Sequence, residues 1–161
     1  MKLLSFLLFL LHNFLNSSNF SYKMDTHFTV INNQIKIPGH LNYATYQLEG
    51  SWTDNYGNYG FNKCMGIINK NYDNVELYFM CEREDKNGFK IWSINKRKSG
   101  LKNSGVGFFE IVDATIPKKE LFIGKKCTYA VKYLKETTFY KSKCKISEEL
   151  SKVFEKMALG K

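Results

Sequence analysis

Alternation of apolar and other residues in short segments is the feature that most limits how this chain can fold. Within Val75–Cys81 (VELYFMC), Val75 and every second residue after it share one face, as in a β-strand. Further segments rich in β-branched or aromatic residues are Phe28–Ile37, Tyr43–Glu49, Phe89–Ile94, Phe108–Ile116, Cys127–Leu134 and Thr137–Cys144. These patterns predict an all-β domain of about seven strands.

Turn residues separate the predicted strands. Pro38-Gly39 ends the first strand, and Thr53–Asn58 (TDNYGN) combines Asp and Asn with a glycine, as β-turns do. Lys86-Asn87-Gly88 predicts a hairpin, and the preceding Glu82–Lys86 is interpreted as a solvated turn. Asn95–Gly107 is basic, rich in Gly and Ser and without apolar periodicity, which predicts a long mobile loop.

The last residues change to a helical period. Apolar residues recur at helical spacing from Leu150 to Ala158, and Ser147 is placed to cap the first turn. A helix over 147–159 is therefore expected, ended by Gly160, with its apolar face on the sheet. A helix lying on a membrane surface is the alternative.

The N-terminus has the order of a secretion signal. Lys2 precedes the apolar run Leu3–Leu11, and small polar residues follow as far as Ser21. The run is about half the roughly 20 residues that a membrane-spanning helix needs. We expect residues 1–21 to be a cleaved signal peptide and residues 22–161 to be one secreted domain without a transmembrane segment.

Four cysteines, Cys64, Cys81, Cys127 and Cys144, follow the predicted signal. An even number in a secreted chain favours two disulfides over a zinc site, and no CxxC pair is present. Four cysteines allow three connectivities. The two equal intervals suggest that each pair bridges neighbouring strands, but they do not exclude the other connectivities.

Positive charge is the other marked property. The formal net charge is +9, and removal of Lys2 with the signal lowers it to +8. Such a surface favours anionic partners. The candidate contact surface is the basic cluster Lys96, Arg97, Lys98 and Lys102, with a solvated connection as the alternative interpretation. Nucleic acid is not expected as a partner, because the aromatic residues fall mostly at strand positions.

No catalytic pattern was found in the sequence. The expected mature chain has two histidines, His27 and His40, and neither belongs to an HExxH motif. A Gly-x-Ser-x-Gly elbow and a Walker-type phosphate loop are also absent. Oxidised cysteines would leave no thiol nucleophile. We therefore expect no enzymatic activity, no metal site and no cofactor.

Four sequence segments carry a family resemblance: the strand-rich Phe28–Glu49, the turn Thr53–Phe61 (TDNYGNYGF), the strand Leu77–Cys81 (LYFMC), and Ile116–Phe122 (IPKKELF). Gly124 and a strand pair that closes at Cys144 follow the last of them. In this order they resemble the nematode transthyretin-like family of small secreted proteins, over roughly residues 28–144.

The resemblance implies a transthyretin-like β-sandwich of two sheets, here with an added C-terminal helix. It also implies a non-enzymatic extracellular role as a carrier, a signalling protein or a parasite effector. The chain departs from the family pattern at Phe79-Met80, where the family usually has His-Asp, and in the positions of Cys64 and Cys127. The family's disulfide pairing is therefore not transferred.

The leading functional hypothesis is an extracellular binding protein that recognises a protein, a lipid or an acidic ligand through surface loops. A cystatin-like protease inhibitor is one alternative, although the Gln-x-Val-x-Gly wedge is absent from the first strand. A lipocalin-like carrier of a small apolar ligand is the other. A large apolar cavity inside a closed barrel would favour the carrier, and a sandwich with a filled core would exclude it.

Overall fold

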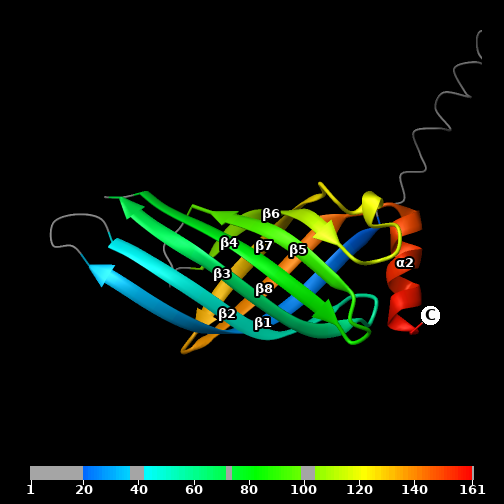
Figure 1. Cartoon of the computed structure of the whole chain (residues 1–161), viewed down its shortest axis with the longest axis horizontal. Coiled ribbons are helices and arrows are strands. Elements are labelled where there is room, and N and C mark those ends of the chain that lie inside the picture. The colour runs from blue at the N-terminus through cyan, green and yellow to red at the C-terminus, as the bar shows by residue number, and fades with distance from the viewer. Residues whose placement is uncertain (1–19, 37–41, 72–73, 99–103, 161) are drawn as a thin grey trace, which may run out of the picture.

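The computed structural model describes residues 20–36, 42–71, 74–98 and 104–160, and eight antiparallel strands form one closed barrel (Figure 1). Each strand pairs with the next along the chain, and the first also pairs with the last. The strands are β1 (Ser21–Lys36), β2 (Asn42–Asp54), β3 (Tyr59–Asn71), β4 (Asn74–Asp85), β5 (Lys90–Arg97), β6 (Gly105–Ala114), β7 (Lys126–Leu134) and β8 (Thr137–Lys145).

The all-β prediction is confirmed, but the expected sandwich of about seven strands is not found. Inward and outward residues alternate in the same way in a barrel wall and in a sandwich, so alternation does not distinguish the two. The strand that the sequence did not reveal is β3. Its inward positions include Asn62 and Gly66, which break the apolar pattern. Membership in the transthyretin-like family stays a prediction from the motifs.

Two clusters of buried hydrophobic residues make up the core. The larger cluster includes Tyr22, Trp52 and Phe109 together with residues of the C-terminal helix. The smaller one includes Phe28, Tyr46 and other residues of β1 to β4. Trp52 donates a hydrogen bond from Nε1 to the Phe61 carbonyl, so its polar atom is satisfied despite burial.

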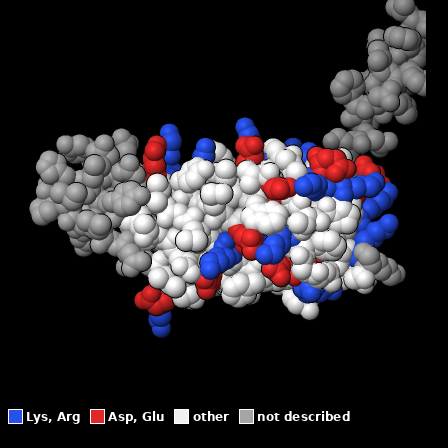
Figure 2. All heavy atoms as spheres, in the orientation of Figure 1, with Lys and Arg blue, Asp and Glu red and all other residues white. Residues whose placement is uncertain are grey.

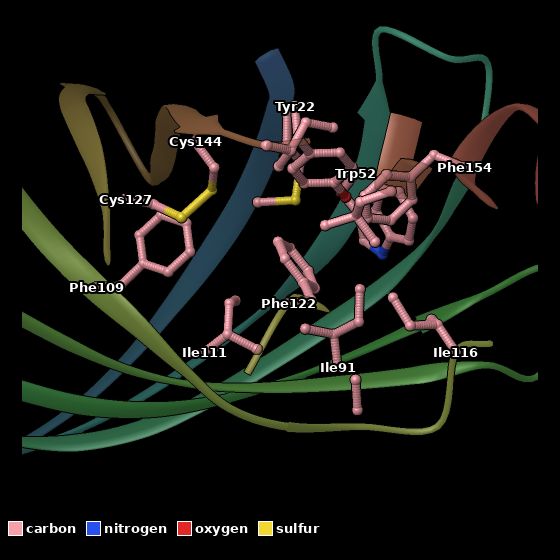
Figure 3. Packing of buried hydrophobic residues seen from close by; sticks show 14 of the residues in the cluster. Tyr22, Trp52, Ile91, Phe109, Ile111, Ile116, Phe122, Cys127, Cys144 and Phe154 are labelled. Atoms are coloured by element: carbon pink, nitrogen blue, oxygen red, sulfur yellow. A yellow bond between two sulfur atoms is a disulfide. The ribbon is translucent and has the colours of Figure 1, made fainter. Parts of the chain in front are cut away.

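The C-terminal helix α2 (Glu148–Ala158) covers one end of the barrel (Figure 1), which confirms the helix that the apolar period predicts. The Leu150 amide donates to Ser147 Oγ over 3.2 Å, so Ser147 caps the first turn as expected. Figure 3 shows Phe154 of α2 packed among aromatic rings. Its ring stacks on Tyr22 at 4.5 Å and meets Phe122 edge-on at 5.4 Å.

Two turns of the same design lie at the helix end of the barrel. Asp54 Oδ1 accepts from the amides of Tyr56 and Asn58, each over 2.9 Å. Asp85 Oδ1 accepts from the amides two and four residues further on, over 2.8 and 2.9 Å. Each turn contains a glycine with positive φ, 92° at Gly57 and 82° at Gly88. Both turns were predicted, the first from its Asp, Asn and Gly and the second from Lys86-Asn87-Gly88; the part that the buried Asp85 plays in the second was not.

These turns also hold α2 in place. Asn58 Nδ2 donates to the Phe154 carbonyl over 3.1 Å, and Asn87 Nδ2 donates to the Met157 carbonyl over 3.0 Å. Lys86 Nζ donates to the Ala158 carbonyl over 2.8 Å. Polar groups from the strand connections therefore satisfy carbonyls of the helix, including those of its last turn.

Two disulfides join neighbouring strands: Cys64–Cys81 links β3 to β4, and Cys127–Cys144 links β7 to β8. Both have a sequence separation of 17. Cys64 and Cys81 stand directly opposite one another in the register. The structure thus selects one of the three connectivities, the one suggested by the equal intervals.

Two expectations lie partly or wholly outside the described residues. The predicted loop Asn95–Gly107 is shorter than expected, because β5 continues to Arg97 and β6 begins at Gly105. Residues 99–103 are outside the described chain. So are residues 1–19 of the predicted signal peptide, and β1 begins at Ser21.

Candidate ligand-binding cavity

A cavity lies inside the barrel between the two buried clusters. Aromatic and aliphatic side chains from strands on different sides of the barrel form much of its wall, among them Phe28, Val30, Leu48, Phe79 and Val131. The cavity has a volume of about 40 Å³ and an opening to solvent. The cavity is therefore narrow and suits a slender molecule better than a bulky ring system.

Arg83 lies in this wall and is 2% exposed. Its guanidinium donates from Nη1 to Met24 Sδ over 3.3 Å and lies 5.3 Å from the centre of the Phe109 ring. The Tyr22 hydroxyl also interacts with Arg83, and all three neighbours are uncharged. Among the ion pairs of the described residues, none involves Arg83, although a buried arginine stays protonated.

The acidic residue nearest to Arg83 along the inner face of β4 is Asp85. Its carboxylate oxygens accept from the Asn87 and Phe89 amides and from Asn87 Nδ2. The described residues that line the cavity include two arginines and no Asp or Glu. The cavity wall is therefore cationic as well as apolar.

Tyrosine and threonine hydroxyls add polar points to the wall. Tyr140 donates to Asn95 Oδ1 over 3.2 Å, and Tyr129 donates to the Lys96 carbonyl over 3.3 Å. Tyr46 Oη and Thr138 Oγ1 are buried and have no hydrogen-bond partner among the described residues. An unmet buried hydroxyl is costly, so these two atoms are free to bind a polar group of a ligand.

Burial raises the pKa of three cavity tyrosines, Tyr46, Tyr129 and Tyr140. It raises the pKa of Tyr129 to about 12, with Arg97 opposing the shift. Burial likewise raises the pKa of Tyr46 and of Tyr140 above the usual range. At neutral pH the tyrosines are therefore hydrogen-bonding groups and do not neutralise the arginines.

The predicted basic contact surface is divided between the two sides of the wall. Lys96 and Lys98 are exposed, with Lys96 Nζ 5.8 Å from the centre of the Tyr78 ring. Arg97 instead faces inward, 4% exposed, and donates to Tyr133 Oη over 2.8 Å, because alternate residues of β5 face the interior. Lys102 lies outside the described residues.

A second basic surface lies on the outside of β7, β8 and β1. Lys143 stands directly across from Lys23, and like charges in that position destabilise a sheet. We call the outward lysines of these strands that enter no ion pair within the described chain the lysine face; they are Lys23, Lys126, Lys132, Lys143 and Lys145. A surface groove lies beside the lysine face. Lys23 and Lys143 of that face line it, together with the exposed Val106 and Phe108 of β6.

The outside of β3 and β4 has a different character. Met65 and Met80, opposite one another in the register, are 59% and 56% exposed. On the face seen in Figure 2, uncharged side chains make up most of the barrel wall, and Lys and Arg gather near the end that α2 covers. Charge on the outside of the barrel is thus unevenly distributed.

Sequence reasoning missed Arg83, which it assigned to a solvated turn. The signal that could have revealed it is the alternation of β4, which continues past Cys81 and turns Arg83 and Asp85 to the same inward face. A charged residue at an inward position of a strand is unusual and indicates either a partner or a ligand.

No protein-family model matches the chain, and no curated protein matches its sequence. No helix of the described residues is long and apolar enough to cross a membrane. The same part of the chain has no group of three or more His, Cys, Asp or Glu side chains arranged to hold a metal ion.

Proposed function

We propose that the protein is a secreted, non-enzymatic carrier that holds a slender apolar ligand inside its barrel. The observation that carries this proposal is the cavity of the closed barrel, lined largely by aromatic and aliphatic side chains. The cavity is smaller and more polar than the large apolar one that the sequence analysis set as the mark of a carrier. The interior of a closed eight-stranded barrel is either filled by side chains or wide enough to hold one small ligand, and the cavity here favours the second case. This is the carrier alternative of the sequence analysis, with recognition inside the barrel in place of the surface loops.

Secretion fits the chemistry of the cysteines. All four cysteines are paired, and disulfides persist in oxidising compartments. The apolar run near the N-terminus has the composition of a secretion signal. In a secreted carrier the signal peptide is cleaved and both disulfides persist.

The lysine face supplies a second part of the proposal, the contact with an anionic surface. Several lysines on neighbouring strands, none of them in an ion pair within the described chain, attract anionic lipid headgroups or acidic polymers. The exposed Val106 and Phe108 beside them add apolar contact. A carrier of apolar ligands that docks on such a surface would load and unload there.

Calorimetric titration with 1-decanol, a slender apolar probe, tests the cavity. We expect saturable binding, and we expect Leu48→Trp to abolish it because a larger side chain would fill the space. The matched control is Gln47→Trp, since Gln47 is the chain neighbour of Leu48 and its side chain is not part of the cavity wall. Absence of binding to the parent protein, or full binding by a folded Leu48→Trp variant, would show that the barrel is not a carrier.

A further inference from the structure

We infer that Arg83 is the binding site for an anionic head group, so that the ligand class is a single-chain amphiphile with a carboxylate or similar group. This inference rests on the proposed carrier function and specifies its ligand. The apolar wall contacts the hydrocarbon chain of the ligand, and the Arg83 guanidinium binds its head group.

The environment of Arg83 is the first step of the argument. A buried ion without a counter-charge is costly, and an arginine cannot lose its proton to escape that cost. The guanidinium meets a thioether sulfur, an aromatic ring and the neutral Tyr22 hydroxyl, which are weak substitutes for a carboxylate. An anionic group entering the cavity would place a counter-charge in direct contact with the guanidinium through charge-assisted hydrogen bonds.

Position within the barrel is the second step. Arg83 lies opposite Ile91 in the register, whereas Arg97 lies opposite Leu77, so the two arginines mark different levels of the cavity. Six residues of β4 separate these levels, about 20 Å at the usual rise of a strand. Arg97 donates to the Tyr133 hydroxyl over 2.8 Å, and Arg83 meets the Tyr22 hydroxyl, so neutral oxygens contact both arginines. Arg83 is the better candidate for the head because it lies near the end that α2 covers, beside the apolar Met24 and Phe109.

The direction of the ligand follows from this placement. Arg83 lies on the same level as Met24, near the end of the barrel that α2 covers, and the apolar lining residues Val30 and Leu48 lie further along β1 and β2. A head bound at Arg83 thus places the chain along the apolar wall, away from α2. The unmet hydroxyls of Tyr46 and Thr138 lie further along the same cavity.

Comparison of two probes that differ only in the head group tests the inference. Decanoate and 1-decanol are titrated calorimetrically into the parent protein and into Arg83→Met at neutral pH. We expect the parent to prefer decanoate by about tenfold to a hundredfold, the range typical of a hydrogen bond to a charged group. We expect Arg83→Met to lose this preference and to keep its affinity for 1-decanol, which also shows that the variant is folded.

Each other outcome overturns a different statement. Binding of neither probe to the parent protein would refute both the carrier function and the head-group site. Equal binding of both probes to the parent would leave the carrier standing and refute the role of Arg83. A preference that survives in Arg83→Met but disappears in Arg97→Met would move the site to the other arginine and contradict our assignment.

Discussion

At the scale of single residues, Asp85 shapes the turn that contacts the C-terminal helix α2. Its side chain accepts the amides of Asn87 and Phe89, and the turn that it shapes presents Asn87 to the last turn of α2. We expect Asp85→Ala to lower the free energy of unfolding by about 1–3 kcal/mol, because two amides lose their acceptor. Urea unfolding measures the change.

The neighbouring Glu84 provides the control for that substitution. It faces outward, half exposed, and pairs with Lys90 at 3.3 Å. A surface ion pair of this kind contributes less than about 1 kcal/mol, so Glu84→Ala should be nearly neutral. Equal losses for the two variants would mean that the turn does not depend on the Asp85 carboxylate.

Buried tyrosines make a prediction about alkaline pH. Burial raises the pKa of Tyr129 from the usual 10 to about 12, and it also raises those of Tyr22, Tyr46 and Tyr140. Above pH 10 the unfolded chain loses these protons first, so stability is full below pH 10 and declines as pH rises through 12. Absorbance at 295 nm should show a delayed, cooperative phase of tyrosine ionisation that coincides with unfolding; ionisation of all tyrosines near pH 10 in the folded protein would contradict this.

Residue patterns predicted the turns and the helix cap well, since Asp and Ser accept neighbouring amides there and Gly supplies a positive φ. They did not predict the role of Arg83 or Arg97. The direction of those side chains depends on how far each strand continues, and the basic residues around Arg97 resembled a loop. Turns and helix caps can therefore be predicted from neighbouring residues. Whether a charged side chain faces inward depends on how far the strand continues, which neighbouring residues do not show.

At the scale of elements, α2 packs on the barrel through Phe154. The ring contacts Tyr22, Tyr56 and Phe122 and is 1% exposed. We expect Phe154→Ala to cost about 3–5 kcal/mol, the usual range for removing a buried aromatic ring. Lys156→Ala on the exposed face of the same helix should change stability by less than about 0.5 kcal/mol. Similar small effects of both changes would show that α2 contributes little to the barrel.

The two disulfides permit a direct comparison of equal loops. Each has a sequence separation of 17, and cross-linking a loop of about 15 residues stabilises a protein by about 3 kcal/mol in the chain-entropy model. Replacing Cys64 and Cys81 by Ser, or Cys127 and Cys144 by Ser, should therefore lower the free energy of unfolding by similar amounts. A marked difference in urea unfolding would mean that local packing, and not loop closure, decides their contribution.

At the scale of the whole molecule, closure of the sheet was not predictable from the sequence. The pairing of β1 with β8 joins residues at opposite ends of the domain, and nothing local to Ser21 or Lys145 indicates it. The added strand β3 carries glycine and asparagine on its inner face and so resembles a connection. The cavity exists only because the sheet closes, and for this reason the sequence suggested recognition by loops.

The uneven charge of the outer wall leads to the last prediction. We expect the protein to bind vesicles of phosphatidylserine and phosphatidylcholine at low salt, through the lysine face. Changing Lys126, Lys143 and Lys145 to Ser should weaken binding by tenfold or more, since each lysine near an anionic surface contributes about 1 kcal/mol. The control changes Lys63, Lys90 and Lys118 to Ser, which removes the same charge from lysines held in ion pairs with Glu49, Glu82 and Glu149. Vesicle co-sedimentation at rising salt compares the variants: a selective loss in the first places the contact on β7 and β8, whereas equal losses would mean that net charge, and no particular face, attracts the protein to the membrane.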